Sequence, residues 1–375
     1  MIIGVLKEQA RETRVSLVPE VVASLTKMNV TVYVEDGAGN AAFFDSRSYE
    51  DAGALIKSKE VICKESDLVL SINHENLNSE LKKNAVVLGV FQPLFNADLM
   101  GKWAEKALTV FSLDSIPRTT RAQGMDVLSS QANIAGYKAV LLAATQYCRY
   151  FPMFMTAAGS IAPAKVLILG AGVAGLQAIA TARRLGAVVE VFDTRPAVKE
   201  EVMSLGAKFI EVEGAADASK AGGYAVEQSE EFQQKQKAKI HEHTRKADVI
   251  ITTAQIPGRK APILITNQMI EDMRAGSVII DLAASTGGNT EVTRNNETVM
   301  HHGVTVIGNS SLAATMPSDA SKMYSKNVFN FLKLIIDKDG NINLNWEDDL
   351  VKGTCIAHDG DIMNDRVKDL LTSKV

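Results

Sequence analysis

Residues 165–193 of this 375-residue chain, KVLILGAGVAGLQAIATARRLGAVVEVFD, decide its fold. Residues 165–169 form an apolar run of the length of a buried parallel strand, and glycines spaced G-x-G-x-x-G follow it. In such a turn the first glycine permits the tight bend, the second lets a pyrophosphate approach the backbone, and the third lets helix and strand pack closely. These glycines are Gly170, Gly172 and Gly175, with Val173 and Ala174 between the last two.

The segment after the glycines predicts a helix and a second strand. Residues 176–185 are the expected helix, whose first N–H groups and dipole would face the phosphates. The strand 188–192 ends at Asp193, in the place where an acid binds an adenosine ribose. Strand, glycines, helix, strand and acid in this order are far more specific than glycines alone, which also mark ordinary turns. We therefore predict a dinucleotide site, with a structural glycine turn as the alternative.

Two charged residues bear on which dinucleotide binds. Asp193 favours NAD, because a carboxylate accepts a hydrogen bond from the ribose 2′-hydroxyl and repels a 2′-phosphate. Arg195 could attract that phosphate and argues for NADP. Since the acid comes first, we expect NAD.

The composition is that of a soluble globular protein, with 46% hydrophobic and 22% charged residues. A net charge of −4 gives no reason to expect nucleic acid or an anionic membrane surface as a partner. The chain starts without the features of a signal peptide, and its three isolated cysteines suit a reducing cytoplasm. The six histidines lack the usual zinc-ligand spacings, so we expect no metal site.

Buried strands alternate with helical stretches in both halves of the chain. This alternation predicts the α/β class, with two doubly wound parallel-sheet lobes, a cleft between them and long helices joining them. Six strands in the second lobe are the full count of a Rossmann-like domain. The expected strands are 2–5, 30–35, 67–72, 85–91 and 108–113 in the first lobe, and 165–169, 188–192, 208–212, 248–253, 277–282 and 304–307 in the second.

Three other stretches complete the expected organisation. Residues 129–150 predict a long buried helix that bridges the lobes. A polar insertion over 213–245 predicts a lid, with disorder as the alternative, and within it a solvated helix over 230–246. An amphipathic helix over 322–336 is expected to return to the first lobe, with a polar tail after it. We thus expect one domain of 1–130 plus about 315–375 and a dinucleotide-binding domain of 131–314.

The segment PRTTRAQGMDVLSS, residues 117–130, gathers two arginines, an amide, a carboxylate and hydroxyls at a strand-to-helix junction. In a doubly wound protein such a loop lies at the carboxyl edge of the sheet. Its composition alone leaves open a solvated helix N-terminus with Asp126 in the first turn.

Several motifs carry a resemblance that covers essentially the whole chain. They are RVSLVPEVV (14–22), PRTTRAQGMDVLSSQANIAGYKAV (117–140), MTAAGSIAPAKVLILGAGVAGLQAIATARRLGA (155–187), FDTRPAVKEEV (192–202), GGYA (222–225), ITTAQIPGRKAP (251–262) and GSVIIDLAASTGGN (276–289). With them the sequence resembles the NAD(H)-binding component, domain I, of proton-translocating nicotinamide nucleotide transhydrogenase. In that family hydride passes directly between NAD(H) on this component and NADP(H) on a separate component, and a membrane component couples the transfer to proton passage.

The resemblance implies a set of site residues. The loop that positions the nicotinamide and its ribose, and with it the catalytic role, matches Arg118, Gln123, Asp126 and Ser129. The nucleotide-binding positions match Val173, Ala174, Asp193, Thr194 and Arg195. A mobile loop that closes on the nucleotide matches Gly223 and Tyr224, with Gln236 on the helix after it. Gln255 lies in a cofactor-facing turn where relatives often carry leucine.

The resemblance also implies a mechanism and partners. Direct hydride transfer needs two nicotinamide rings held close and water kept out, so no acid or base is required. We expect a homodimer on the cytoplasmic side, attached peripherally to the inner membrane through the NADP(H)-binding and membrane components. Since the chain stops at Val375 after a polar tail, we expect a separate soluble subunit, with a shortened form of a fused chain as the alternative.

Two rival functions remain open. Alanine dehydrogenase is a relative that uses a lysine and a histidine in the first lobe and an aspartate near the last strand. Here Arg14 of that family's RVxxxP start is present, but Ser71, Phe91 and Ser285 stand where the other three are expected, so we expect no amino-acid oxidation. A binding-only NAD module is the second rival, and it would leave the loop around Gln123 without a purpose.

Overall fold

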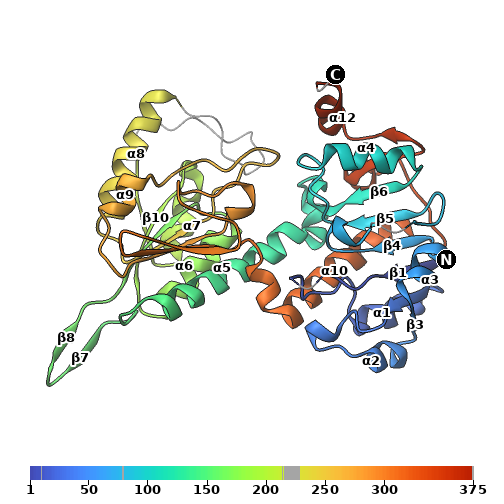
Figure 1. The fold of residues 1–375 in the computed structure, drawn as a ribbon, viewed down its shortest axis with the longest axis horizontal. Helices are drawn as coiled ribbons and strands as arrows, with labels where there is room; N and C mark the ends of the chain where they lie inside the picture. The colour runs from blue at the N-terminus through green and yellow to red at the C-terminus, as the bar shows by residue number, and fades with distance from the viewer. Residues whose placement is uncertain (10, 78–79, 213, 215–228, 374–375) are drawn as a thin grey trace. The chain divides into compact units, whose positions relative to one another are not determined.

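The computed structural model describes residues 1–9, 11–77, 80–212, 214 and 229–373. The chain divides into two compact units: unit 1 is Met1–Gln131 with Ala313–Val375, and unit 2 is Ala132–Leu312. Each unit contains one large sheet with helices on its faces (Figure 1). Unit 2 is therefore an insertion between two segments that together build unit 1.

The sheet of unit 2 has the strand order of a dinucleotide-binding domain. Its six parallel strands run in the order third, second, first, fourth, fifth, sixth along the chain, and one antiparallel strand is added at the edge. In spatial order they are β11 (Lys208–Phe209), β10 (Val188–Phe192), β9 (Lys165–Leu169), β12 (Val249–Thr252), β13 (Val278–Asp281), β15 (Val304–Gly308) and β14 (Glu297–His301). All six predicted strands are present, and β14 was not predicted.

Side chains of the parallel strands alternate between two cores, one on each face of the sheet. In β9, Val166 and Ile168 belong to one hydrophobic cluster, and Leu167 and Leu169 belong to the other. Strands buried on both faces read as continuous apolar runs, which is why the sequence revealed them. The helices of unit 2 are α6 (Val173–Arg184), α7 (Lys199–Ser204), α8 (Glu230–Thr244) and α9 (Asn267–Glu271).

Unit 1 also contains a doubly wound sheet, with five predicted parallel strands at its centre. In spatial order its strands are β17 (Asp361–Ile362), β16 (Cys355–His358), β6 (Thr109–Ser112), β5 (Val86–Gly89), β4 (Leu68–Leu70), β1 (Ile2–Val5), β2 (Thr31–Glu35) and β3 (Leu55–Lys57). The strands β16 and β17 are antiparallel, and the others are parallel. Two doubly wound, mostly parallel sheets confirm the predicted fold class.

The C-terminal region differs from the predicted polar tail. The helix α10 (Pro317–Ile335) begins five residues before the predicted start at 322, because Pro317 suits the first turn of a helix. After it, two helices and two strands complete unit 1, and β16 buries Cys355, Ile356 and Ala357 completely or almost completely. The helices of unit 1 are α1 (Pro19–Thr26), α2 (Ser46–Asp51), α3 (Lys59–Glu65), α4 (Ala97–Glu105), α10, α11 (Asp349–Thr354) and α12 (Asp365–Thr372).

Two predicted helices need correction. The bridging helix, α5 (Val127–Gln146), ends four residues early and buries only part of its surface, with Leu128 and Tyr137 exposed. The boundary between the units falls inside it, after Gln131. The predicted solvated helix, α8, does carry charged i,i+4 pairs, but its other face buries Phe232 and Ile240.

A short antiparallel hairpin of β7 (Phe154–Thr156) and β8 (Gly159–Ile161) extends away from the rest of unit 2 (Figure 1). Its side chains are exposed, including those of Phe154, Met155 and Ile161. Across the described portion of the chain, no helix combines the length and the apolar character that crossing a bilayer requires.

Candidate functional site: a dinucleotide turn and a polar loop

The three glycines after β9 have three different surroundings. Gly170 has a φ of +105°, a conformation that L side chains rarely adopt. A Cβ on Gly175 would lie 1.9 Å from the carbonyl oxygen of Gly170, so the third glycine is required by packing. A Cβ on Gly172 would meet nothing within 4 Å. The second glycine therefore faces open space, as expected where a pyrophosphate approaches the backbone.

The helix α6 begins directly after Gly172, which is its N-cap. Glycine has no side chain to accept hydrogen bonds from the first turn, so the N–H groups at this end are available to an anion. Val173 and Ala174 form the start of the helix, three residues earlier than the sequence predicted. This geometry suits a phosphate group.

Asp193 follows β10 and closes the glycine turn from the other side. Its Oδ2 accepts a hydrogen bond from the backbone N–H of Ala171 at 2.7 Å. Arg195 donates from Nε to Oδ1 at 2.9 Å and from Nη2 to Oδ2 at 2.7 Å. These hydrogen bonds raise the pKa of the Arg195 guanidinium above its usual range. The arginine is thus directed at Asp193, and the acid is held beside the turn.

A pocket lies beside Asp193 and Thr194. Its wall includes Phe232, in the first turn of α8. Gln236 lies four residues after Phe232 and hence on a neighbouring position of the same helix face. The other lining residues are Phe192, Pro196, Lys199, Phe209, Glu211 and Val212.

The carboxyl edge of β13 contains a buried polar cluster that the sequence analysis missed. Asp281 accepts from the N–H of Asn289 at 2.6 Å and from the hydroxyl of Thr293 at 2.6 Å. The side chain of Asn289 in turn bonds the N–H and the carbonyl of Ala254, at 3.0 and 2.9 Å. These bonds fix the backbone just before Gln255, whose exposed side chain donates to the carbonyl of Leu282 at 3.2 Å.

In unit 1, the loop 117–130 is held by its own carboxylate and by α10. Asp126 caps α5, because Oδ1 accepts from the N–H of Ser129 at 2.9 Å and Oδ2 accepts from its hydroxyl at 2.6 Å. Asn327 and Asn330 both donate to the carbonyl of Gly124, at 2.9 and 2.8 Å. The helix-cap interpretation of Asp126 is therefore correct as far as its own contacts go.

The two other loop residues of the predicted site, Arg118 and Gln123, have exposed side chains. Between them, Arg121 forms a two-pronged ion pair with Asp348 at 2.8 and 2.5 Å, which ties the loop to the start of α11. The loop thus presents an amide and a guanidinium on a fixed backbone.

A second buried polar cluster of unit 1 surrounds Arg14. Its guanidinium bonds both carboxylate oxygens of Glu12, at 2.7 and 2.6 Å, and Nη1 donates to Gln131 at 2.8 Å. Burial alone would raise the pKa of Glu12, but the hydrogen bonds and charge of Arg14 outweigh burial and lower it. An arginine that could bind a substrate carboxylate is here occupied by an internal one.

Glu8 lies beside this cluster and is almost completely buried. Its Oε1 accepts from the N–H of Ile72 at 2.5 Å and from the hydroxyl of Ser71 at 3.2 Å, and its Oε2 accepts from Asn76 at 2.7 Å. Burial raises the pKa of Glu8 to about 7. No signal in the sequence distinguished Glu8 from a surface acid.

The positions that alanine dehydrogenase would need for its own chemistry are otherwise used. The hydroxyl of Ser71 bonds Glu8 and the carbonyl of Asn73. Phe91 is fully buried against Trp103, with ring centroids 5.2 Å apart. Ser285 is exposed in a short 3-10 helix after β13.

The predicted site residues therefore form two groups. Unit 2 brings together Gly170, Gly172, Val173, Ala174 and Gly175 with Asp193, Thr194 and Arg195. Unit 1 holds Arg118, Gln123, Asp126 and Ser129 in one loop. Gly223 and Tyr224 of the predicted lid lie outside the described residues.

Comparison with known proteins identifies the class. The family "Alanine dehydrogenase/PNT, N-terminal domain" matches residues 4–135, and "Alanine dehydrogenase/PNT, C-terminal domain" matches residues 139–365. The chain belongs to this alanine dehydrogenase/PNT family and is an NAD-binding oxidoreductase of Rossmann-like fold.

Within the family, the chain is more similar to transhydrogenase alpha subunits than to alanine dehydrogenases. It is 44% identical to an NAD(P) transhydrogenase alpha subunit of Rickettsia prowazekii, over 97% of this chain and 96% of that protein. The crystal structure of transhydrogenase from Sinorhizobium meliloti is 42% identical and superposes with a TM-score of 0.87, covering 96% of this chain and all of that one. Alanine dehydrogenase of Staphylococcus haemolyticus is more distant, at 26% identity over 90% of this chain and 88% of that protein.

Proposed function

We propose that this chain is the NAD(H)-binding alpha subunit of a proton-translocating transhydrogenase. Hydride passes directly between NADH on this chain and NADP⁺ on a partner component, and a membrane component couples the transfer to proton movement. The observation that carries the proposal is the glycine turn: Gly172 faces open space at the N-terminus of α6, in a chain closely similar to transhydrogenase alpha subunits.

The residues of the turn fit the two ends of the cofactor's adenosine diphosphate moiety. The first turn of α6 would hold the pyrophosphate through backbone N–H groups. Asp193 would accept from the ribose, because a carboxylate has about four lone-pair sites and Ala171 and Arg195 leave room for another donor. With Arg195 neutralised by Asp193, a 2′-phosphate gains little there, which supports NAD over NADP.

The chemistry needs position rather than proton transfer. NAD(H) supplies the hydride, and the chain's own work is to fix the nicotinamide and exclude water. Gln123 would hold the carboxamide or a ribose hydroxyl, on a backbone that Asn327, Asn330 and Arg121 immobilise. The pairing of Arg14 with Glu12 supports hydride transfer over amino-acid oxidation, because that arginine is already bound to an internal carboxylate.

A mixing experiment separates the candidate functions. The purified chain is combined with an NADP(H)-binding transhydrogenase component, and hydride exchange between NADH and an oxidised nucleotide is followed. Exchange that requires both components, with none from alanine plus NAD, supports the proposal. NADH formation from alanine by the chain alone indicates an alanine dehydrogenase, and nucleotide binding with neither activity indicates a binding-only module.

The role of Gln123 is tested by Gln123→Asn in the same assay. The shorter side chain withdraws the amide from the nicotinamide, so exchange is expected to slow much more than NADH binding weakens. Because the side chain is exposed, the fold is expected to tolerate the change. Weaker binding with unchanged turnover would place Gln123 away from the nicotinamide.

We further propose that two copies of the chain form a homodimer, attached through the partner components to the cytoplasmic face of the inner membrane. The β7–β8 hairpin supports self-association, since Phe154, Met155 and Ile161 are 44%, 75% and 42% exposed. Apolar side chains gathered on a projecting element are typical of a protein interface.

A further inference from the structure

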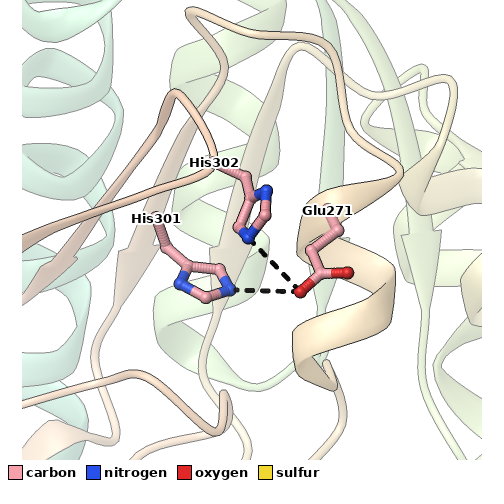
Figure 2. Close-up of side chains that lie close together, drawn as sticks. All are labelled: Glu271, His301 and His302. Carbon is pink, nitrogen blue, oxygen red and sulfur yellow. Dashed lines mark ion pairs between the residues drawn. The ribbon is translucent and has the colours of Figure 1, made fainter.

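The hairpin between β14 and β15 brings two adjacent histidines against a carboxylate of α9. His302 Nε2 lies 3.4 Å from Glu271 Oε1, and His301 Nε2 lies 3.8 Å from the same oxygen. One ligand atom from each of the three residues falls within 4.8 Å of the others. Figure 2 shows both imidazoles pointing at the carboxylate.

The backbone of the hairpin produces this arrangement. His301 pairs with Val304, so the turn consists of His302 and Gly303 alone. Both have positive φ, +48° and +77°, as a two-residue hairpin of the right twist requires. Asparagine is the usual non-glycine residue in such a turn, and histidine here directs its ring toward α9.

The existing contacts do not satisfy these groups. The Nε2 atom of His301 is buried yet has no hydrogen-bond partner, since 3.8 Å to the carboxylate is too long. Glu271 is the last residue of α9, where the helix dipole disfavours an anion. Within the described residues, Glu271 forms no ion pair with a lysine or arginine. A cation between the three groups would satisfy all of them.

We propose that Glu271, His301 and His302 form a binding site for Zn²⁺ or a similar divalent transition metal. Two imidazole nitrogens and one carboxylate oxygen are a known zinc ligand set, and imidazole selects such ions over Mg²⁺. Ligands about 2.0–2.1 Å from a tetrahedral ion lie roughly 3.4 Å apart, so small side-chain movements suffice. The side chains of His302 and Glu271 are 58% and 37% exposed, which leaves solvent access for entry and for a remaining ligand.

The site is separate from the nucleotide turn and does not depend on the proposed function. The hairpin precedes β15 and therefore lies at the amino-terminal end of that parallel strand. The glycine turn follows the carboxyl-terminal end of β9. An ion here would fasten the edge hairpin to α9.

Zinc binding is measured by competition with a chromophoric chelator, using the whole chain and the variants His302→Asn and Glu271→Gln. Asparagine is suited to the positive φ of the turn, so His302→Asn is expected to keep the fold. The control is His241→Asn, which removes a histidine that pairs with the neighbouring Asp272 at 2.7 Å. Circular dichroism and NADH binding verify that every variant is folded.

The expected result is one Zn²⁺ per chain, bound at least about tenfold more weakly by both ligand variants and unchanged in His241→Asn. Zinc should also raise the thermal unfolding midpoint of the wild type and not that of His302→Asn. Anomalous diffraction at the zinc edge should place the ion between the three side chains. Equal affinity in wild type and His302→Asn, displacement by Mg²⁺ at similar concentration, or an anomalous peak elsewhere would each overturn the proposal.

Discussion

Gly172 and Gly175 belong to one turn but are glycines for different reasons. At Gly175 a methyl group would collide with the carbonyl of Gly170, whereas at Gly172 it would project into open space. One glycine is therefore needed by the protein itself, and the other is needed only when a ligand approaches.

This difference predicts opposite phenotypes for two alanine substitutions. Gly175→Ala is expected to destabilise unit 2 by about 3 kcal/mol, because the backbone must shift. Gly172→Ala is expected to cost about 1 kcal/mol or less, yet to weaken NADH binding about tenfold or more. Urea unfolding and NADH fluorescence titration measure the two effects. Normal NADH affinity in a folded Gly172→Ala protein would contradict the assigned pyrophosphate position.

Glu8 predicts a pH dependence whose sign follows from its raised pKa. Between about 4.5, its ordinary value, and about 7, the native protein retains a proton that the unfolded chain releases. Stability contributed by this proton is complete below that window and is lost as pH rises through it. Glu8→Gln stays neutral, so the wild type should lose up to roughly 3 kcal/mol relative to this variant between about pH 4.5 and 7.5.

Urea unfolding of both proteins across this pH range provides the measurement, and the difference between them removes the contribution of other titrating groups. A difference that stays constant with pH would show that Glu8 titrates normally in the folded protein.

At the scale of elements, the N-terminus of α5 combines a structural and a proposed functional role in Asp126. Asp126→Ala removes the acceptor for the N–H of Ser129 and should cost about 1 kcal/mol. Asp126→Asn keeps an acceptor oxygen and should be nearly as stable as the wild type. If Asp126 also helps to place the nicotinamide ribose, the asparagine variant should still exchange hydride more slowly. Thermal unfolding and the two-component assay measure these outcomes, and full activity in Asp126→Asn would reduce the residue to a helix cap.

The elements that the sequence predicted are those whose residues are buried on both faces. The strands β9 and β10 have the predicted bounds, because continuous apolar runs of five residues leave little ambiguity. Edge strands were missed for the opposite reason: in β14 every side chain is exposed or partly exposed. The strand β16 is buried but is too short to stand out in a polar region.

The candidate site was predictable where a motif is local. The glycines and Asp193 lie in one continuous segment, so spacing alone gave their arrangement. The partners of Asp281, Asn289 and Glu8 come from distant residues, and a polar residue in a loop carries no sign of such a partner. An acid at the last position of a buried strand, as at Asp281, was the one usable signal.

At the scale of the whole molecule, the proposed homodimer predicts that the β7–β8 hairpin controls association. Met155→Lys combined with Ile161→Lys places two charges on exposed positions, so the unit should fold while the dimer dissociates. Met300→Lys is the matched control, because Met300 is 66% exposed on β14. Analytical ultracentrifugation should show a monomer for the double variant and a dimer for the control. An undisturbed dimer in the double variant would place the interface elsewhere.

The division of unit 1 into two chain segments has a consequence for biosynthesis. When the ribosome has released Leu312, all of unit 2 is available, but unit 1 still lacks α10 and the strand β16 that pairs with β6. The middle of the nascent polypeptide can therefore complete its native contacts before the segment that was translated first. Until synthesis nears its end, the open edge of β6 is a place where a chaperone would find unpaired backbone.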